Sequence, residues 1–290
     1  MALFDRIVMV DWSAAAVPTT GRDSIWMAVA EKGRLAGEPS NVPTRFEAMA
    51  RLRALCANGL RVLVGFDFAF GYPAGTASRF GTDGWRSVWS WLAGHLMDGD
   101  DNANNRFETA SRFNSRFPHV DGPLWGRPRS IAMEGVSAGK PAAMPNGIET
   151  RRRVETIVRS AQPVWKLAYP GSVGSQALTG IARLQRWRSE GAARSAVAIW
   201  PFETEFSRRL ERPVTVAEIY PSLFPIEARP DEVKDAAQVR TLAVGYSRLD
   251  ATGTLEPHLG GPSDDQTRRT ALQEEGWIMS VTDRALTLSP

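Results

Sequence analysis

Apolar residues gather in short runs along the first quarter of the chain, and two of these runs lead into an aspartate. Residues 6–14 (RIVMVDWSA) are rich in Val and Ile and carry Asp11, and residues 61–73 (RVLVGFDFAFGYP) carry Asp67. Short apolar runs of this kind are typical of buried strands. The pattern therefore predicts two strands, each of which delivers a carboxyl group to the edge of a sheet.

The segment between these two runs contains signals for further strands and one helix. Residues 24–31 (SIWMAVAE) read as a second strand, and a turn leads into a possible short third strand near 31–35. Thr44 and Glu47 have the spacing of a capping box before a helical pattern over 45–59. This order predicts a mixed sheet whose first strands are antiparallel, followed by a right-handed crossover.

The remaining chain alternates helical patterns with two more apolar strands, which predicts an α/β fold in a single domain over 1–290. Periodicity is weak over 98–170, and this length is unusual for a plain loop, so we expect an insertion or cap near the site. Strands are expected at 195–203 and 214–222. Helices are expected at 84–97, 149–161, 231–249 and 264–275, and a further helix follows a Gly/Ser turn within 169–191.

Composition narrows the possible functions. The chain is 43% hydrophobic and 23% charged, as in a globular protein, and its net charge of +3 is too small to indicate a dedicated nucleic-acid tract. The single cysteine, Cys56, excludes intrachain disulfides and zinc sites built from several cysteines. The first residues lack a signal-peptide pattern and no apolar run reaches membrane-spanning length, so we expect a cytoplasmic protein with no membrane partner.

Four acids occupy positions that catalysis could use. Asp11 and Asp67 end strands, Glu218 lies late in a strand, and Asp235 lies one turn into the next helix. Acids brought to one edge of a sheet either shift their pKa values or bind a hard cation such as Mg²⁺ or Mn²⁺ through oxygen. Such a cluster suits metal-assisted attack of water on phosphorus. Alternatively, each carboxylate merely caps a loop or a helix.

The glycine- and serine-rich turn that leads into the helix within 169–191 is a candidate anion site. Backbone N–H groups of such a turn can face a phosphate, and the helix dipole assists. The turn lacks the Gly-Lys-Ser/Thr of a nucleotide-binding loop, so an ordinary capped turn is the alternative. The candidate binding residues are Gly171, Ser172, Gly174 and Ser175, with Lys166 just upstream.

Further basic residues could contact a substrate. Arginines interleave with aromatic residues over 106–129, among them Arg127, which suits a substrate with both phosphates and bases. Lys234 and Arg240 flank Asp235 and could neutralise phosphate. A packed cap and local ion pairs explain the same residues equally well.

Several motifs together resemble the bacterial DUF 429 family of predicted nucleases, within the ribonuclease H-like superfamily. They recur in the order of that family and spread over most of the chain. The matching stretches are VMVDWSA at 8–14, VGFDFAFGYP at 64–73, AEIYPSLF at 217–224 and KDAAQVRTLA at 234–243, with GSVGSQALTGI at 171–181 as a subgroup signature.

The resemblance implies a ribonuclease H-like central mixed sheet flanked by helices. It assigns Asp11 and Asp67 as the acids of the first and fourth strands and as metal ligands. For the third ligand it favours Asp235 and leaves Asp264, Asp265 and Glu218 as further candidates. The chain departs from many relatives where a second Asp-Ala helix is expected; here the segment reads TRRTALQEEGW.

Three functions follow as hypotheses. The first is a Mg²⁺- or Mn²⁺-dependent phosphodiester hydrolase that acts on nucleic acid. The second is a phosphotransferase or cofactor-pathway enzyme of the same fold that acts on a phosphorylated small molecule. The third is a binding protein without catalysis, whose acids are structural. The same superfamily contains ATP-binding proteins, so fold alone does not choose among them.

Overall fold

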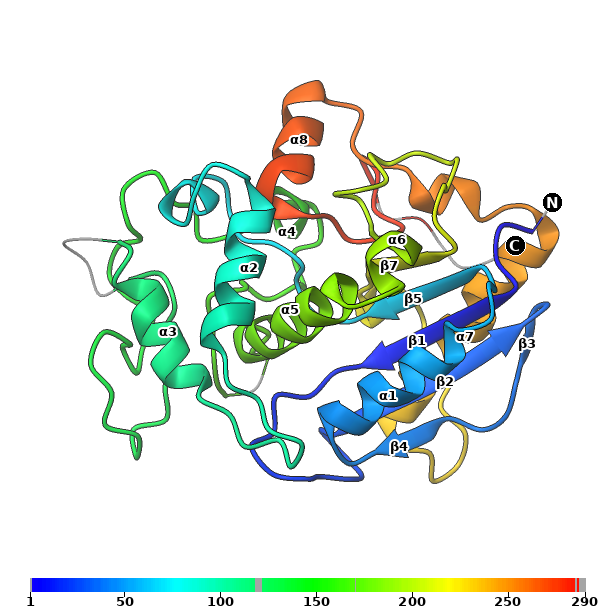
Figure 1. Ribbon diagram of the computed structural model, residues 1–290, viewed down its shortest axis with the longest axis horizontal. Coiled ribbons are helices and arrows are strands. Elements are labelled where there is room, and N and C mark those ends of the chain that lie inside the picture. Colours follow the sequence, from blue (N-terminus) through cyan, green and yellow to red (C-terminus); the bar gives the residue numbers. More distant parts are fainter. Residues whose placement is uncertain (1, 118–121, 170, 285, 287–290) are drawn as a thin grey trace.

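A seven-stranded mixed sheet forms the centre of the protein, and helices cover both of its faces (Figure 1). The computed structural model describes residues 2–117, 122–169, 171–284 and 286. The strands are β1 (Arg6–Asp11), β2 (Ile25–Glu31), β3 (Arg34–Leu35), β4 (Ser40–Val42), β5 (Val62–Phe66), β6 (Val197–Ile199) and β7 (Val214–Glu218).

The strand order is β3-β2-β1-β5-β7-β6, and β4 also pairs with β2. β2 runs antiparallel to β1, whereas β5, β7 and β6 run parallel to β1. The register sets Val10 beside Phe66, and Phe66 beside Glu218. The parallel strands β1, β5 and β7 therefore all end at one edge of the sheet.

The apolar runs correctly located the main strands, and the α/β class with a mixed sheet is confirmed. The first strand is shorter than predicted, because it ends at Asp11. The strand expected at 195–203 is reduced to Val197–Ile199, just before Pro201, whose missing N–H cannot extend a ladder. β4 was not predicted; with three residues it has no recognisable pattern.

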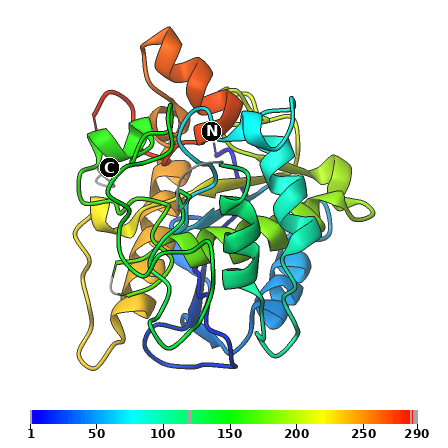
Figure 2. The same cartoon turned by 90° about the vertical axis from the view of Figure 1, so that its left-hand side faces the viewer.

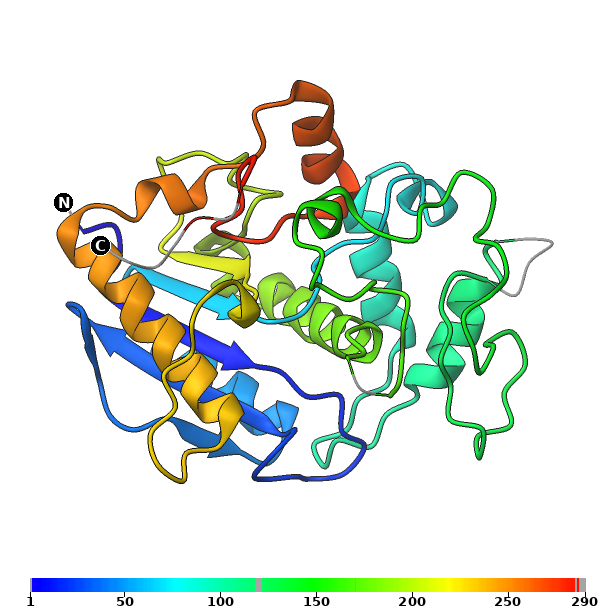
Figure 3. The same cartoon turned by 180° about the vertical axis from the view of Figure 1, so that it is seen from behind.

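Helices lie on both sides of the sheet. α7 crosses β1 and β2 on one face (Figure 3), while α1, α2 and α5 lie on the other (Figure 1). No helix of the described residues combines the length and apolar character needed to cross a bilayer. The α-helices are α1 (Arg45–Leu55), α2 (Trp85–His95), α3 (Arg106–Asn114), α4 (Arg153–Ile157), α5 (Gly174–Ser189), α6 (Ala193–Ala196), α7 (Lys234–Thr252) and α8 (Asp265–Thr270).

Side-chain alternation along β1 divides the core into two clusters. Val8 and Val10 pack with α1, α2 and α5, whereas Ile7 and Met9 pack with α7. Successive strand residues point to opposite faces, so Asp11 follows Ile7 and Met9 toward the α7 side. The same alternation in β5 places Leu63 on the α7 side.

The described residues of the segment 98–170, which are 98–117 and 122–169, form mostly irregular chain with two short helices, α3 and α4 (Figure 2). Several of its buried side chains, including Phe107, Phe113 and Trp165, belong to the same cluster as Val8 and Val10. The described part of this segment therefore extends the main core.

Candidate functional site

Asp11 and Asp67 lie together where β1 and β5 end. Val10 and Phe66 are register partners, so the two aspartates leave adjacent strands at the same level. Their carboxyl groups share a hydrogen bond. The Trp12 backbone N–H, immediately after Asp11, donates to Asp67 Oδ1 at 2.8 Å. Each strand thus contributes an acid, and the backbone of one strand orients the acid of the other.

A third acid approaches the pair from helix α7. Asp235 lies in the first turn of α7, which packs across β1 and β2. One oxygen of Asp235 accepts a hydrogen bond of 2.8 Å from the Asp23 backbone N–H, in the turn before β2. Asp11, Asp67 and Asp235, which sequence reasoning grouped together, are therefore close in space, and Asp23 joins them.

The acids destabilise one another's charge. Burial raises the pKa of Asp11 well above its ordinary value, and the negative charges of Asp67 and Asp235 raise it further. Burial also raises the pKa of Asp67 to about 7, while the Trp12 N–H lowers it in part. The hydrogen bond between the carboxyls raises the pKa of Asp11 and lowers that of Asp67, while burial raises the pKa of both.

This geometry offers two carboxyls in contact and a third held back. Within 2–117, 122–169, 171–284 and 286, no group of three or more His, Cys, Asp or Glu side chains is arranged to hold a metal ion. Asp235 instead binds the Asp23 amide. The donors of the pair are all oxygen, and a cation replacing the shared proton would relieve their repulsion, so the pair suits a hard cation.

Glu218 is engaged elsewhere. It is buried, and its two oxygens accept from the Arg152 guanidinium at 2.6 and 2.8 Å. The Phe70 N–H donates to it at 3.0 Å. Strand alternation directs Glu218 away from the face taken by its neighbours Ala217 and Ile219, which pack on the α7 side. The structure thus commits Glu218 to an ion pair with Arg152.

Two more acids considered for the third ligand, Asp264 and Asp265, lie at the start of α8. Asp264 is the N-cap of this helix and accepts from the Thr267 N–H at 2.7 Å. Asp265 is the first residue of α8. In Figures 1 and 3, α8 stands at the top of the molecule, away from the end of β1. The structure therefore does not bring these residues to the pair.

The glycine- and serine-rich turn uses its polar groups internally. The Gly174 N–H donates to the Lys166 carbonyl, and the buried Ser175 hydroxyl donates to the Leu167 carbonyl at 2.6 Å. The Ser172 N–H binds the Tyr169 carbonyl. At Gly171 the backbone φ is +73°, which favours glycine. The predicted anion site is thus a turn that closes on the segment before it.

Gly174 is required for that contact. A Cβ atom at this position would lie 2.5 Å from the Val164 carbonyl oxygen and 2.7 Å from the Lys166 carbonyl oxygen. Only a glycine allows two backbones to approach so closely. The sequence signal of a glycine before a helix was real, but its cause is backbone packing.

The predicted basic contacts have local partners or lie exposed. Arg127 donates to the Val136 and Ile131 carbonyls and shapes its own loop. Arg240 forms an ion pair with Glu232. Lys234 is exposed at the first turn of α7, next to Asp235. Of these three cations, Lys234 is the one that stands beside the acids.

Sequence reasoning missed a buried arginine that fixes the chain after Asp11. Arg45 is fully buried, forms an ion pair with Asp98, and donates to the carbonyls of Ser13 and Ala15. Arg183 from α5 binds the same Asp98. Arg45 follows the predicted N-cap Thr44, and the helical pattern gave it no reason to be buried.

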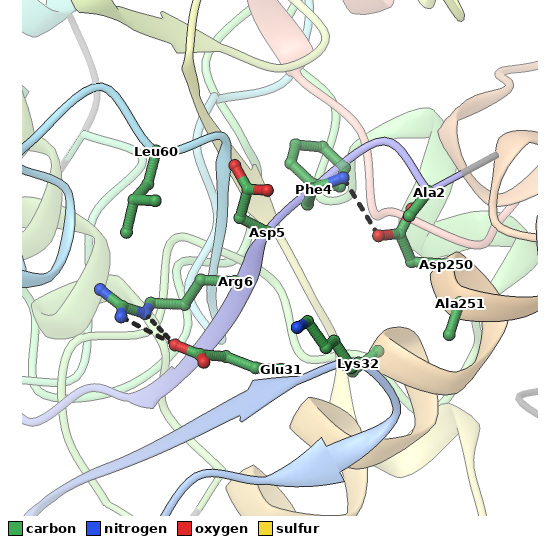
Figure 4. A pocket seen from close by; sticks show the side chains of 10 residues that line it. Ala2, Phe4, Asp5, Arg6, Glu31, Lys32, Leu60, Asp250 and Ala251 are labelled. Carbon is green, nitrogen blue, oxygen red and sulfur yellow. Dashed lines mark hydrogen bonds and ion pairs between the residues drawn. The ribbon is translucent and has the colours of Figure 1, made fainter.

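A cavity of about 420 Å³ lies near the other end of β1 (Figure 4). Its polar side chains include groups that already have partners: Arg6 pairs with Glu31, and Asp250 accepts from the Leu3 and Phe4 amides. Because Arg6 begins β1 and Asp11 ends it, this cavity is separate from the aspartate pair.

Comparisons with protein-family models, with curated proteins and with solved structures gave no match.

Proposed function

We propose that the chain is a ribonuclease H-like, metal-dependent phosphodiester hydrolase that acts on nucleic acid. The proposal is supported by a sheet in which an antiparallel second strand flanks β1 and parallel strands follow on its other side. One strand of this sheet, β1, ends in Asp11, and Asp67 directly follows the adjacent strand β5. The proposal depends most on one observation, the hydrogen-bonded contact between Asp11 and Asp67.

The aspartate pair would hold the cation. Asp11 and Asp67 would give up the shared proton, and Asp235 would turn from the Asp23 amide to complete the set of oxygen ligands. A bound Mg²⁺ or Mn²⁺ supplies a more acidic water and charge stabilisation for the leaving oxygen. The exposed Lys234 lies where it could contact a phosphate next to the acids.

The test is Mn²⁺ binding by calorimetry together with cleavage of labelled oligonucleotides. We expect Asp11→Asn and Asp67→Asn each to reduce cleavage by more than about 100-fold, since even outer-shell partners of a metal contribute 10–100-fold. Asp5→Asn is the matched control: Asp5 lies just before β1 and binds the Arg61 amide, a contact that asparagine can keep. The control should cleave at the wild-type rate.

Full activity in both Asp11→Asn and Asp67→Asn would overturn the assignment. Stabilisation of the wild type by ATP and Mg²⁺, without any response to oligonucleotides, would favour a phosphotransferase instead. The internal use of the glycine turn's amides gives the phosphotransferase hypothesis no support of its own.

A further inference from the structure

Helix α5 contacts the residue that follows each of the two aspartates Asp11 and Asp67. Trp12 follows Asp11 and Phe68 follows Asp67; both rings are buried, and their centroids are 6.0 Å apart. The Trp12 indole N–H donates to Thr179 Oγ1 at 3.2 Å, in the interior. The Gln176 side-chain amide donates to the Trp12 carbonyl. One helix turn therefore holds both the ring and the backbone of Trp12.

Gly180, on the next position of α5, receives the ring of Phe68. A Cβ atom there would lie 2.2 Å from Phe68 Cζ, well inside contact distance. Glycine in the middle of a helix is unfavourable, so its presence needs a compensating contact. The Phe68 ring lying directly on the helix backbone is that contact.

The backbone of Trp12 connects helix α5 to the aspartate pair. The Trp12 N–H donates to Asp67 Oδ1 at 2.8 Å, while the Trp12 carbonyl accepts from Gln176. The main chain of Trp12 is therefore fixed on one side by α5 and fixes Asp67 on the other. Phe68 anchors the residue immediately after Asp67 on the same helix.

We propose that Gln176, Thr179 and Gly180 are positioning residues, which hold Asp67 against Asp11 by gripping Trp12 and Phe68. This gives the GSVGSQALTGI segment a role in the site without contact with substrate. The inference rests on the proposed function for its effect on metal and activity, but its structural part can be tested separately.

The structural test measures hydrogen exchange of the Trp12 amide, which reports its bond to Asp67. Gln176→Ala and Gly180→Ala should each speed this exchange by about tenfold or more, relative to the amide of Val64 in the core of β5. Gln185→Ala is the matched control, because Gln185 lies on the same helix and its side chain binds Ser189 and Arg188, away from Trp12. It should leave the Trp12 amide unchanged.

The functional test measures Mn²⁺ affinity and separates kcat from KM. Gln176→Ala and Gly180→Ala should weaken Mn²⁺ binding by about 10–100-fold, as loss of an outer-shell partner does. Thr179→Val keeps the shape but removes the acceptor and should lower kcat with little change in KM. Thr179→Ser, which keeps the hydroxyl, should restore kcat.

The outcomes separate the two proposals. If the wild type binds no Mn²⁺ and cleaves nothing, the proposed function fails, while the exchange of the Trp12 amide still decides the positioning role. If folded Gln176→Ala and Gly180→Ala keep wild-type exchange at Trp12, the positioning role is overturned, whether or not Mn²⁺ binds. Equal kcat losses in Thr179→Val and Thr179→Ser would also overturn it.

Discussion

Two groups of acids sit at the same edge of the sheet and are treated in opposite ways. Glu218, at the end of β7, shares the interior with Glu155, and both bind the guanidinium of Arg152. Around Asp11 and Asp67, at the ends of β1 and β5, the charges that act most on Asp11 come from other aspartates. Burial raises the pKa of Glu218 as it does for the pair, but Arg152 offsets part of that shift.

The difference separates an acid that stabilises the fold from acids that are suited to a function. A buried carboxylate with an arginine and a backbone amide has its charge and lone pairs satisfied, as Glu218 has from Arg152 and Phe70. The charges that act most on Asp11 are negative, and strongly shifted acids of this kind cluster at functional sites. The contrast supports the proposal that the pair takes its positive charge from a bound cation.

The largest expected effect comes from removing the cation of the satisfied group. Arg152→Met would leave Glu218 and Glu155 buried without this partner, and we expect it to lower the free energy of unfolding by about 3–5 kcal/mol in urea at pH 7. Arg51→Met removes an exposed ion pair with Glu47 and should cost less than about 1 kcal/mol. Equal losses in both variants would remove the contrast between the two groups.

The next largest effect on stability is expected when one carboxyl of the Asp11–Asp67 pair is replaced by an amide. A carboxyl whose pKa is raised on folding binds its proton more tightly in the folded state, so stability is greatest at low pH. The stability that Asp67 contributes should fall as the pH rises from about 4, the pKa of an aspartate in the unfolded chain, to about 7, its pKa in the folded protein. Asp67→Asn cannot ionise, and we expect it to raise the free energy of unfolding at pH 8 by about 1–3 kcal/mol, with little change at pH 4.

Urea unfolding with a chelator present, at pH 4 and pH 8, measures this effect. Asp11→Asn should behave in the same way, because burial and the neighbouring charges also raise the pKa of Asp11. Asp5→Asn, near the other end of β1, should follow the wild type at both pH values. If the free energy of unfolding of Asp67→Asn depended on pH as steeply as that of the wild type, ionisation of Asp67 would not destabilise the folded protein and the expectation would be wrong.

Much of the fold could be predicted from the sequence, because each main strand or helix has a recognisable pattern within its own residues. The apolar runs around Asp11 and Asp67 are continuous, so strands with acids at their ends could be predicted without knowing their neighbours. The helix start was also a local signal: Thr44 accepts from the Glu47 N–H as the N-cap, although the Glu47 carboxylate binds Arg51 and does not complete a capping box. Short pieces such as β4 carry too few residues to form a pattern, and only pairing with β2 makes them strands.

The rest of the site could not be predicted because it depends on contacts between distant segments. The sequence predicted that Gly174 and Ser175 could bind an anion. In the structure they bind the carbonyls of Lys166 and Leu167, which belong to a stretch without periodicity. Glu218 was predicted as a catalytic acid because it lies late in an apolar strand, as Asp11 does. Its partner Arg152 lies 66 residues earlier in the chain.

The smallest effect addresses Glu218 directly and sharpens the contrast most. In Glu218→Gln, an amide oxygen can still accept from the Phe70 N–H, and Arg152 keeps Glu155 as its counter-ion. We therefore expect a loss of about 1 kcal/mol, the size of a charged hydrogen bond made neutral. Mn²⁺ affinity and cleavage should stay at wild-type values, because the group at Glu218 holds an arginine in place of a metal. A fall in Mn²⁺ affinity similar to that of Asp67→Asn would instead return Glu218 to the metal site and join the two acid groups into one.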